Sequence, residues 1–230
     1  MHTQQAKDLR TAAYNFSEMN GARLSSLLEE KAALLLSWLD HLSKYKRTGT
    51  ADSLLDALSS LVIESAGLLS LGLVRPTIFS LRGQVDLLLA WLYFKDHRVE
   101  WIHVNDTGDG FKLKKEIFSY LDQHYPRFGS RFGILKDIKT RGEADPYRML
   151  SAHIHAQSDP VLPRTECFSD LVRAVDIANE CAGGQFEIGE YLNDILLGVY
   201  AHDFVSLPRF IQESLISRFK SPEQRKSFFQ

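Results

Sequence analysis

The chain has 230 residues, of which 44% are hydrophobic and 24% charged, with a formal net charge of −2. This composition is typical of a globular protein with a sizeable core and excludes an intrinsically disordered chain. The longest apolar run, residues 85–94, contains Asp86 and is shorter than the roughly 20 residues that a membrane span needs. Two cysteines, Cys167 and Cys181, argue against a disulfide framework, and no basic-then-apolar leader opens the sequence. We therefore expect a cytoplasmic protein that does not span a membrane.

The first half of the chain has a helical period. Leucines recur every three or four residues within 24–45, which predicts a long amphipathic helix that ends near Gly49. A weaker helix from about residue 4 precedes it, with a break or bend near Asn20 and Gly21. Residues 54–69 repeat the pattern, and Pro76 begins a third helix with an apolar stripe from Ile78 to Leu92.

The second half continues with shorter helices. Residues 105–110 predict a loop, 113–124 a helix, 125–129 a break and 132–138 a further turn or two. Asp145 and Pro146 are typical of a helix start, and this helix is expected to reach about Ala156. A long helical stretch over 165–203 follows, with a possible interruption at residues 183–184, and two C-terminal helices begin at Pro208 and Ser221.

No segment alternates like a strand, and no linker divides the chain. The pattern predicts an all-α fold: an antiparallel helical bundle of about seven or eight helices forming one domain over residues 1–230.

Several short motifs match known functional sites, but the sequence lacks the structural context that those sites need. Asp106-Thr107-Gly108 spells an aspartic-protease triplet, but that chemistry needs a strand-flanked loop and a second copy. His153 and His155 lie two residues apart on a predicted helix, so they point about 200° away from each other and cannot share a metal ion. Phosphate-binding glycine loops are absent as well. We therefore predict neither a metal nor a cofactor.

The helix after Pro146 carries the one constellation suited to catalysis. Helical spacing places Arg148, Ser151 and His155 on one face. A histidine can move the proton of a ribose hydroxyl, a guanidinium can hold a phosphate, and a serine can position either partner. The alternative is that this face is simply the solvated or hydrogen-bonded side of an amphipathic helix.

The same helix resembles the HEPN superfamily of small all-helical bacterial and archaeal proteins. Arg148-x4-His153 and Arg148-x6-His155 both satisfy its Arg-x4–6-His motif, and the run from Tyr147 to His155 is similar to a Tyr-x-x-Leu-Ser-x-x-x-His segment of some HEPN-like proteins. In those proteins an earlier helix carries an arginine followed by an acidic residue, as Arg82 and Asp86 stand here. The resemblance covers about residues 54–205.

This resemblance implies a helical bundle that often dimerises. It also implies a metal-independent endoribonuclease of a toxin–antitoxin or anti-phage system, although other members are non-catalytic assembly modules. Arg148 would bind the phosphate, His155 or His153 would be the catalytic histidine, and Ser151 would position them. Arg82 and Asp86 would support the motif helix, or would form a structural ion pair. Met149 departs from the nuclease motif, which has a polar residue there.

A basic segment precedes the motif helix. Residues 112–148 hold nine cations and five acids, a net charge of +4. Arginines interleaved with aromatic residues are typical of a single-stranded RNA groove. The alternative is a loop whose phenylalanines fold into the core. The candidate RNA-binding residues are Arg127, Phe128, Arg131, Lys136, Lys139 and Arg141.

A second hypothesis belongs to another functional class. The protein would be a non-catalytic helical interaction subunit whose long helix over 24–45 builds an oligomer or docks a larger effector, such as a protein from the same operon. The Arg148 face would then be structural, and Met149 favours this hypothesis.

Overall fold

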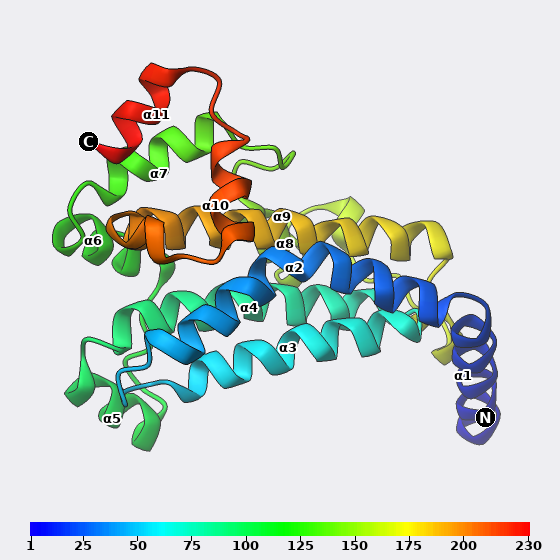
Figure 1. Ribbon diagram of the computed structural model, residues 1–230. Coiled ribbons are helices and arrows are strands. Elements are labelled where there is room, and N and C mark those ends of the chain that lie inside the picture. Colours follow the sequence, from blue (N-terminus) through cyan, green and yellow to red (C-terminus); the bar gives the residue numbers. More distant parts are fainter. The chain divides into compact units, whose positions relative to one another are not determined.

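The computed structural model describes residues 1–230 and contains helices without any strand, which confirms the all-α fold (Figure 1). The helices of the first half are α1 His2–Phe16, η1 Ser17–Gly21, α2 Ala22–Tyr45, α3 Ser53–Ser70, α4 Val74–Phe94, α5 Arg98–Thr107 and α6 Lys114–His124. Those of the second half are α7 Phe128–Asp137, α8 Pro146–Ile154, η2 Asp159–Val161, η3 Phe168–Leu171, α9 Val175–Tyr200, η4 Ala201–Ser206, α10 Arg209–Ile216 and α11 Pro222–Phe229.

The α-helices outnumber the seven or eight that the sequence pattern predicts. One reason is α5, which extends through Thr107, so the first half of the predicted loop over 105–110 is helical. The helix ends at Gly108, whose φ of 77° is left-handed and therefore suits glycine. The stretch 165–203, predicted as one long helix, is divided into the 3-10 helices η3 and η4 and the α-helix α9 between them.

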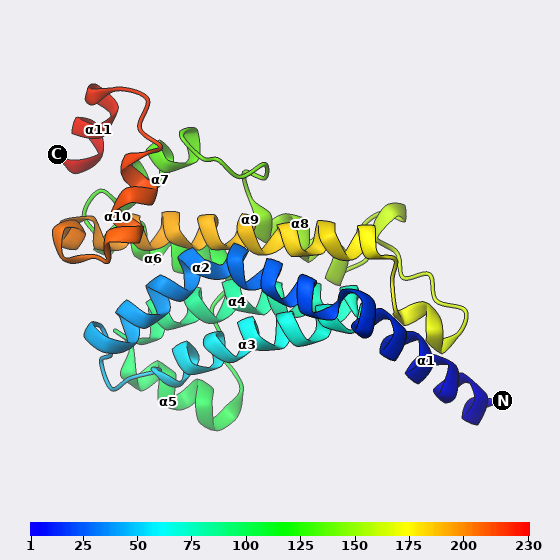
Figure 2. The same ribbon diagram turned by 45° about the vertical axis from the view of Figure 1, so that its right-hand side comes forward.

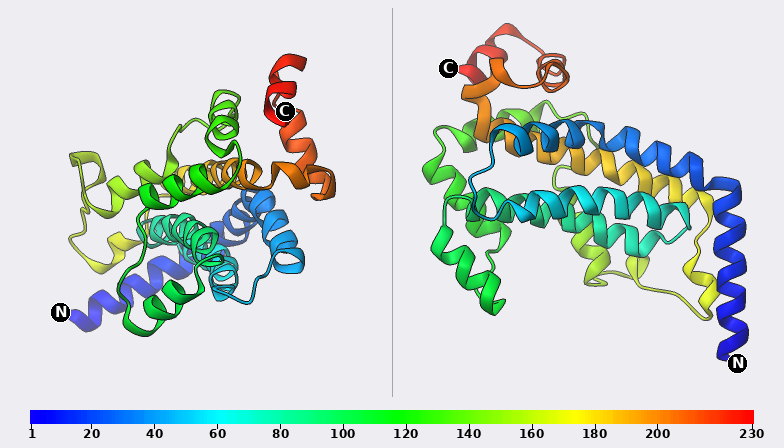
Figure 3. Two further views of the ribbon diagram at one scale, coloured as in Figure 1. Left: turned by 90° about the vertical axis from the view of Figure 1, so that its left-hand side faces the viewer. Right: turned by 60° about the horizontal axis from the view of Figure 1, so that its bottom comes forward.

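Of the break or bend predicted near Asn20 and Gly21, the structure has no break: the helix continues through this point as a π-helical turn, η1. A Cβ at residue 21 would lie 2.8 Å from the Ser17 hydroxyl oxygen and 3.1 Å from the carbonyl oxygen of Ser70, so glycine permits this close approach. Helix α1, which precedes this turn, lies alongside η3 (Figure 3). The rings of His2 on α1 and Phe168 on η3 stack with their centres 6.4 Å apart.

The possible interruption at residues 183–184 does not occur, because α9 runs through both glycines. Its buried apolar residues compensate for the low helix propensity of glycine. They include Ala178, Ala182, Ile188, Leu192 and Ile195.

The chain forms two compact units by its internal contacts. The first comprises Met1–Ala33, Ser60–Gln84 and Asp145–Ile188. Within this unit, segments of α2, α3, α4 and α9 lie side by side (Figures 1 and 2). Gln84 joins two of its neighbours in the core, since its amide donates to Ser65 at 3.1 Å and exchanges hydrogen bonds with Gln185 at 2.9–3.0 Å.

The second unit comprises Leu34–Ser59, Val85–Ala144 and Gly189–Gln230. The indole of Trp38 on α2 donates to Asn193 on α9 at 2.8 Å, and both side chains are fully buried. In the same unit α7 contacts α6 and α11, so the C-terminal helix is anchored on the middle of the chain (Figure 2).

The predicted apolar stripe of α2 is buried from Leu24 to Leu42. In the interaction hypothesis this stripe would form the contact with another subunit, but its leucines are already buried by other residues of the same chain. By length and composition α3 is the one helix apolar enough to cross a membrane, with a mean hydropathy of 1.3. A core helix of a globular protein meets the same criteria, and one third of α3 is buried.

Candidate active site on helix α8

Helix α8 begins where the sequence predicts. The Asp145 side chain accepts a hydrogen bond from the backbone N–H of Arg148, and Pro146 occupies the first turn. Pro146 and Leu150 are buried, so they anchor the apolar side of the helix in the first unit.

Helix α8 ends two residues earlier than predicted, at Ile154. Ala156 adopts a left-handed φ of 49°, and the N–H of Gln157 donates to the carbonyl of Ala152 at 3.1 Å. This is a Schellman C-cap, which normally uses glycine in the left-handed position. His155 therefore stands at the C-cap and not within the last helical turn.

Arg82 on α4 holds α8 in place. Its Nε donates to the Ser151 hydroxyl at 3.0 Å, and its guanidinium carbon lies 3.5 Å from the centre of the Tyr147 ring. The Ser151 hydroxyl in turn donates to the Tyr147 carbonyl at 2.8 Å. Partial burial lowers the pKa of Arg82, while Tyr147 and Asp145 favour its charge. Arg82 and Ser151 thus fix the position of the helix.

Asp86, the other residue expected to support the motif helix, is half-buried one turn after Arg82 on α4. It belongs to the second unit, whereas Arg82 belongs to the first.

Arg148 and His155 are the exposed members of the predicted constellation. The Arg148 side chain makes no hydrogen bond or ion pair, so its guanidinium is open to a ligand. Arg148 and His155 are seven positions apart in the sequence, which corresponds to about 10 Å along a helix axis. Their side chains can therefore flank a bound group without touching each other.

The other histidine of the motif differs in its surroundings. His153 is half-buried, and burial followed by the nearby charge of Arg75 lowers its pKa. Of the two candidate histidines, His155 is the one on the accessible side.

Two of the predicted RNA-binding arginines hold the C-terminal helix. Arg127 donates to the carbonyl of Ser227 at 2.9 Å, and Arg131 donates to the carbonyl of Phe228 at 3.2 Å. Partial burial lowers the pKa of Arg131, and Arg127 lowers it further. Both guanidiniums therefore anchor α11.

The aromatic residue of that segment lies in the core. Phe128 is 2% exposed, and its ring packs against α9, where a Cβ at Gly198 would come within 2.9 Å of it. A role in stacking on RNA bases would require the Phe128 ring to leave the core. For Phe128, the structure agrees with the alternative interpretation, in which the phenylalanines of this segment fold into the core.

The remaining predicted cations also differ in access. Lys136 is exposed, whereas the Lys139 ammonium donates to the carbonyls of Arg141 and Gly142 at 2.8 and 2.9 Å. The Arg141 side chain is fully buried. Only Lys136 is therefore presented freely to solvent.

Arg141 belongs to a buried ionic cluster that the sequence pattern does not reveal. It pairs with Asp194 at 2.5 Å, and Arg218 pairs with the same carboxylate at 2.7 Å. Burial raises the pKa of Asp194, while the two arginines oppose that shift. Glu190 accepts from the backbone N–H groups of Thr140 and Arg141. The sequence signal available for this cluster was the pair of acids Glu190 and Asp194, which lie one turn apart in an apolar stretch of α9.

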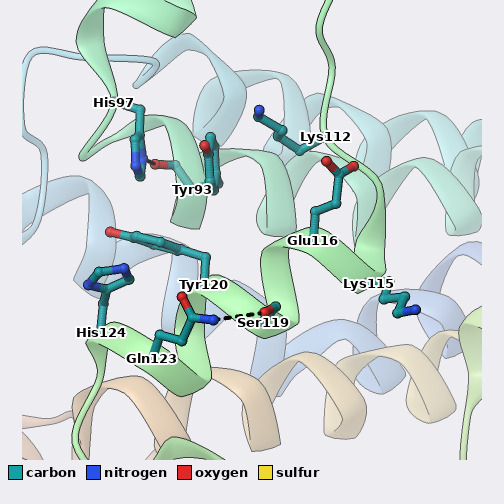
Figure 4. Close-up of a pocket in the computed structure, with 9 residues that line it drawn as sticks. All are labelled: Tyr93, His97, Lys112, Lys115, Glu116, Ser119, Tyr120, Gln123 and His124. Atoms are coloured by element: carbon teal, nitrogen blue, oxygen red, sulfur yellow. Dashed lines mark hydrogen bonds between the residues drawn. The ribbon is translucent and has the colours of Figure 1, made fainter.

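One pocket belongs to the second unit, whereas α8 belongs to the first. It has a volume of about 590 Å³ and is lined by α6, the end of α4 and the segment between α5 and α6 (Figure 4). No group of three or more His, Cys, Asp and Glu side chains is placed to hold a metal ion.

No family model matches this chain, and no curated protein or solved structure matches it either.

Proposed function

We propose that this protein is a HEPN-like, metal-independent endoribonuclease whose site is the polar face of α8. One observation carries the proposal: Arg148 and His155 are both exposed on a helix that Arg82 holds through Tyr147 and Ser151. An anchored helix with an open guanidinium and an open imidazole meets the requirement for preorganised groups around a phosphodiester.

The reaction follows from these two groups. His155 accepts the proton of a ribose 2′-hydroxyl, and the 2′-oxygen forms a bond to phosphorus as the bond to the 5′-oxygen breaks. Arg148 holds the non-bridging oxygens as their charge grows. The leaving 5′-oxygen takes a proton from histidinium or solvent. The products are a 2′,3′-cyclic phosphate and a 5′-hydroxyl.

The wider setting is part of the same proposal. The helices would form an antiparallel bundle that dimerises and brings two α8 faces to one cleft. The enzyme would act on cytoplasmic RNA in anti-phage defence or in toxin–antitoxin regulation.

The test is cleavage of labelled single-stranded RNA by the full chain in EDTA. We expect Arg148→Ala and His155→Ala each to reduce the rate at least about 100-fold, the scale of an acid–base or electrostatic contribution. His153→Ala should retain most activity. Matched controls are Arg10→Ala on α1 and His103→Ala on α5, which remove exposed residues of the same types on other helices.

Thermal melting of each variant shows whether it is folded. Substrate with a single 2′-deoxyribose at the cleavage position should resist cleavage there. Unchanged activity in Arg148→Ala and His155→Ala, with wild-type melting, would overturn the proposal.

A second candidate function is a non-catalytic assembly subunit. Exposed apolar side chains on α5 favour it, since Val99 is 82% exposed and Ile102 is 49% exposed one turn away. If assembly uses this face, Val99→Ser with Ile102→Ser should lower the particle mass measured by light scattering. An unchanged mass would remove α5 as the interface.

A further inference from the structure

The pocket in the second unit brings together cationic, polar and aromatic side chains in a defined order. They come mainly from α6, where Glu116, Ser119, Tyr120, Gln123 and His124 share one face and Lys115 lies at its N-terminal edge. Figure 4 shows Tyr93 and His97 facing the Tyr120 ring across this pocket. Its volume of about 590 Å³ lies within the range of small-molecule sites.

The aromatic end is rigid. The rings of Tyr93 and His97 stack at 4.0 Å with 3° between their planes, and Tyr120 meets both edge-to-face at 5.1 and 4.8 Å. The Tyr120 hydroxyl donates to Asp96 at 2.9 Å, so the ring is fixed from outside the pocket. His124 lies 4.8 Å from the Tyr120 ring. These rings offer flat surfaces for a planar ligand.

His97 also has a defined polar atom. Its Nδ1 lies 2.7 Å from the Tyr93 carbonyl oxygen, which can only accept, so Nδ1 carries the hydrogen. In the neutral ring Nε2 is then an acceptor. A ligand N–H group would find a partner beside the aromatic surface.

The other end of the pocket is cationic. Lys115 is exposed and its ammonium has no side-chain or carbonyl partner. Lys112 forms an ion pair with Glu100 at 2.9 Å, while one oxygen of Glu116 accepts from the backbone N–H of Leu113. Lys115 is therefore the free positive charge of the site.

Polar acceptors lie between the two ends. The second oxygen of Glu116 has no hydrogen bond, and the Ser119 hydroxyl accepts from the Gln123 amide at 3.3 Å. Lys115 and Tyr120 are five residues apart, about 7.5 Å along the helix and about 140° around it, so the flexible Lys115 side chain has to curve past Glu116 and Ser119 to share a ligand with the ring.

We propose that this pocket binds a mononucleotide. Its base stacks on Tyr120 and His124, its ribose hydroxyls donate to Glu116, and its phosphate is held by Lys115. The volume of this open pocket suits one nucleotide, and the net charge of −2 gives the whole protein no general attraction for a long polyanion. The proposal does not depend on the endoribonuclease function of α8.

Isothermal titration of the full chain with adenosine 5′-monophosphate at low salt tests this site. We expect saturable binding, and weaker binding of adenosine, inorganic phosphate and the 2′-deoxynucleotide. Lys115→Ala should weaken binding about tenfold, the effect of losing one charge-assisted hydrogen bond. The matched control is Lys7→Ala, which removes an exposed lysine on α1.

The ring is tested by a pair of variants. Tyr120→Leu should weaken binding about tenfold, the scale of one base–aromatic stack, and Tyr120→Phe should weaken it less, because the ring is kept and only the hydrogen bond to Asp96 is lost. If Tyr120→Leu fails to fold, His124→Ala replaces it at an exposed position of the same surface.

Three outcomes would overturn the proposal. They are no binding of any nucleoside monophosphate at 1 mM (on the order of the weakest specific affinities), equal binding by Lys115→Ala and Lys7→Ala, and binding of a ten-nucleotide RNA (about the site size of a strand-binding groove) without binding of mononucleotides. The RNA cleavage test on Arg148 and His155 is separate, since neither residue lines this pocket.

Discussion

The guanidinium carbon of Arg82 lies 3.5 Å from the centre of the Tyr147 ring, while the Nε of the same side chain donates to the Ser151 hydroxyl at 3.0 Å. One side chain thereby joins α4 to two successive turns of α8. Because α8 is a short helix of nine residues, it depends on such tertiary contacts for its stability.

Replacing this arginine should loosen the helix. We expect Arg82→Ala to lower the free energy of unfolding by about 2 kcal/mol, the sum of a cation–π contact and a charged hydrogen bond. Arg82→Lys keeps the charge but loses the guanidinium contact and the Nε donor, so its loss should be intermediate. Urea unfolding measures both. Amide exchange should also rise in α8 of Arg82→Ala, and unchanged protection there would contradict a positioning role.

The left-handed C-cap beside His155 predicts a stabilising substitution. Ala156→Gly should raise the free energy of unfolding by about 0.5–1 kcal/mol, because glycine adopts this backbone conformation without the Cβ penalty. Ala152→Gly is the matched control, and inside the helix it should destabilise by up to about 1 kcal/mol. Thermal melting distinguishes the two, and destabilisation by both would show that the turn is not left-handed.

The buried ionic cluster predicts that Arg141 acts on stability. Arg141→Met should cost about 3–5 kcal/mol, because it leaves the buried Asp194 carboxylate with one partner fewer. Lys136→Met, at an exposed site on α7, should change the free energy of unfolding by less than about 0.5 kcal/mol. Urea unfolding compares them. A stable Arg141→Met protein with weakened RNA binding would instead restore the predicted RNA contact.

His41 predicts a pH dependence of stability. It is 4% exposed and its Nε2 has no partner; burial, followed by the charge of Lys46, lowers its pKa below the usual 6.5. The unfolded chain binds the proton more readily, so the free energy of unfolding should be highest above pH 6.5 and should fall as the pH drops through that value.

The measurement is urea unfolding at pH 8.0, 6.5 and 5.5, a series around the ordinary histidine pKa of about 6.5. His41→Phe keeps the ring contacts with Trp38 and Tyr45 but cannot titrate, so its stability should depend less on pH over this interval. His103→Ala, which removes an exposed histidine, should retain the wild-type dependence. Equal slopes for wild type and His41→Phe would exclude His41 as the source.

Local signals predicted much of the fold. Apolar residues at helical spacing marked α2, α3 and α4, the Asp145 cap marked the start of α8, and Gly21 marked the π-helical turn. Such signals act within a few residues, so they can be recognised without the rest of the chain. They were wrong at Asn105, which is helical, because α5 continues to the left-handed Gly108 and so ends three residues later than the glycine-rich composition suggested.

Access to the candidate sites depended on residues far apart in the sequence. Arg148 and Arg141 look alike in sequence, yet one is exposed and the other pairs with Asp194, 53 residues away. Phe128 is buried because Gly198 leaves room for its ring. The sequence by itself determined the helical class and the residues available for chemistry. Tertiary packing decided which of them face solvent, because burial and ion pairing arise from contacts that local periodicity does not encode.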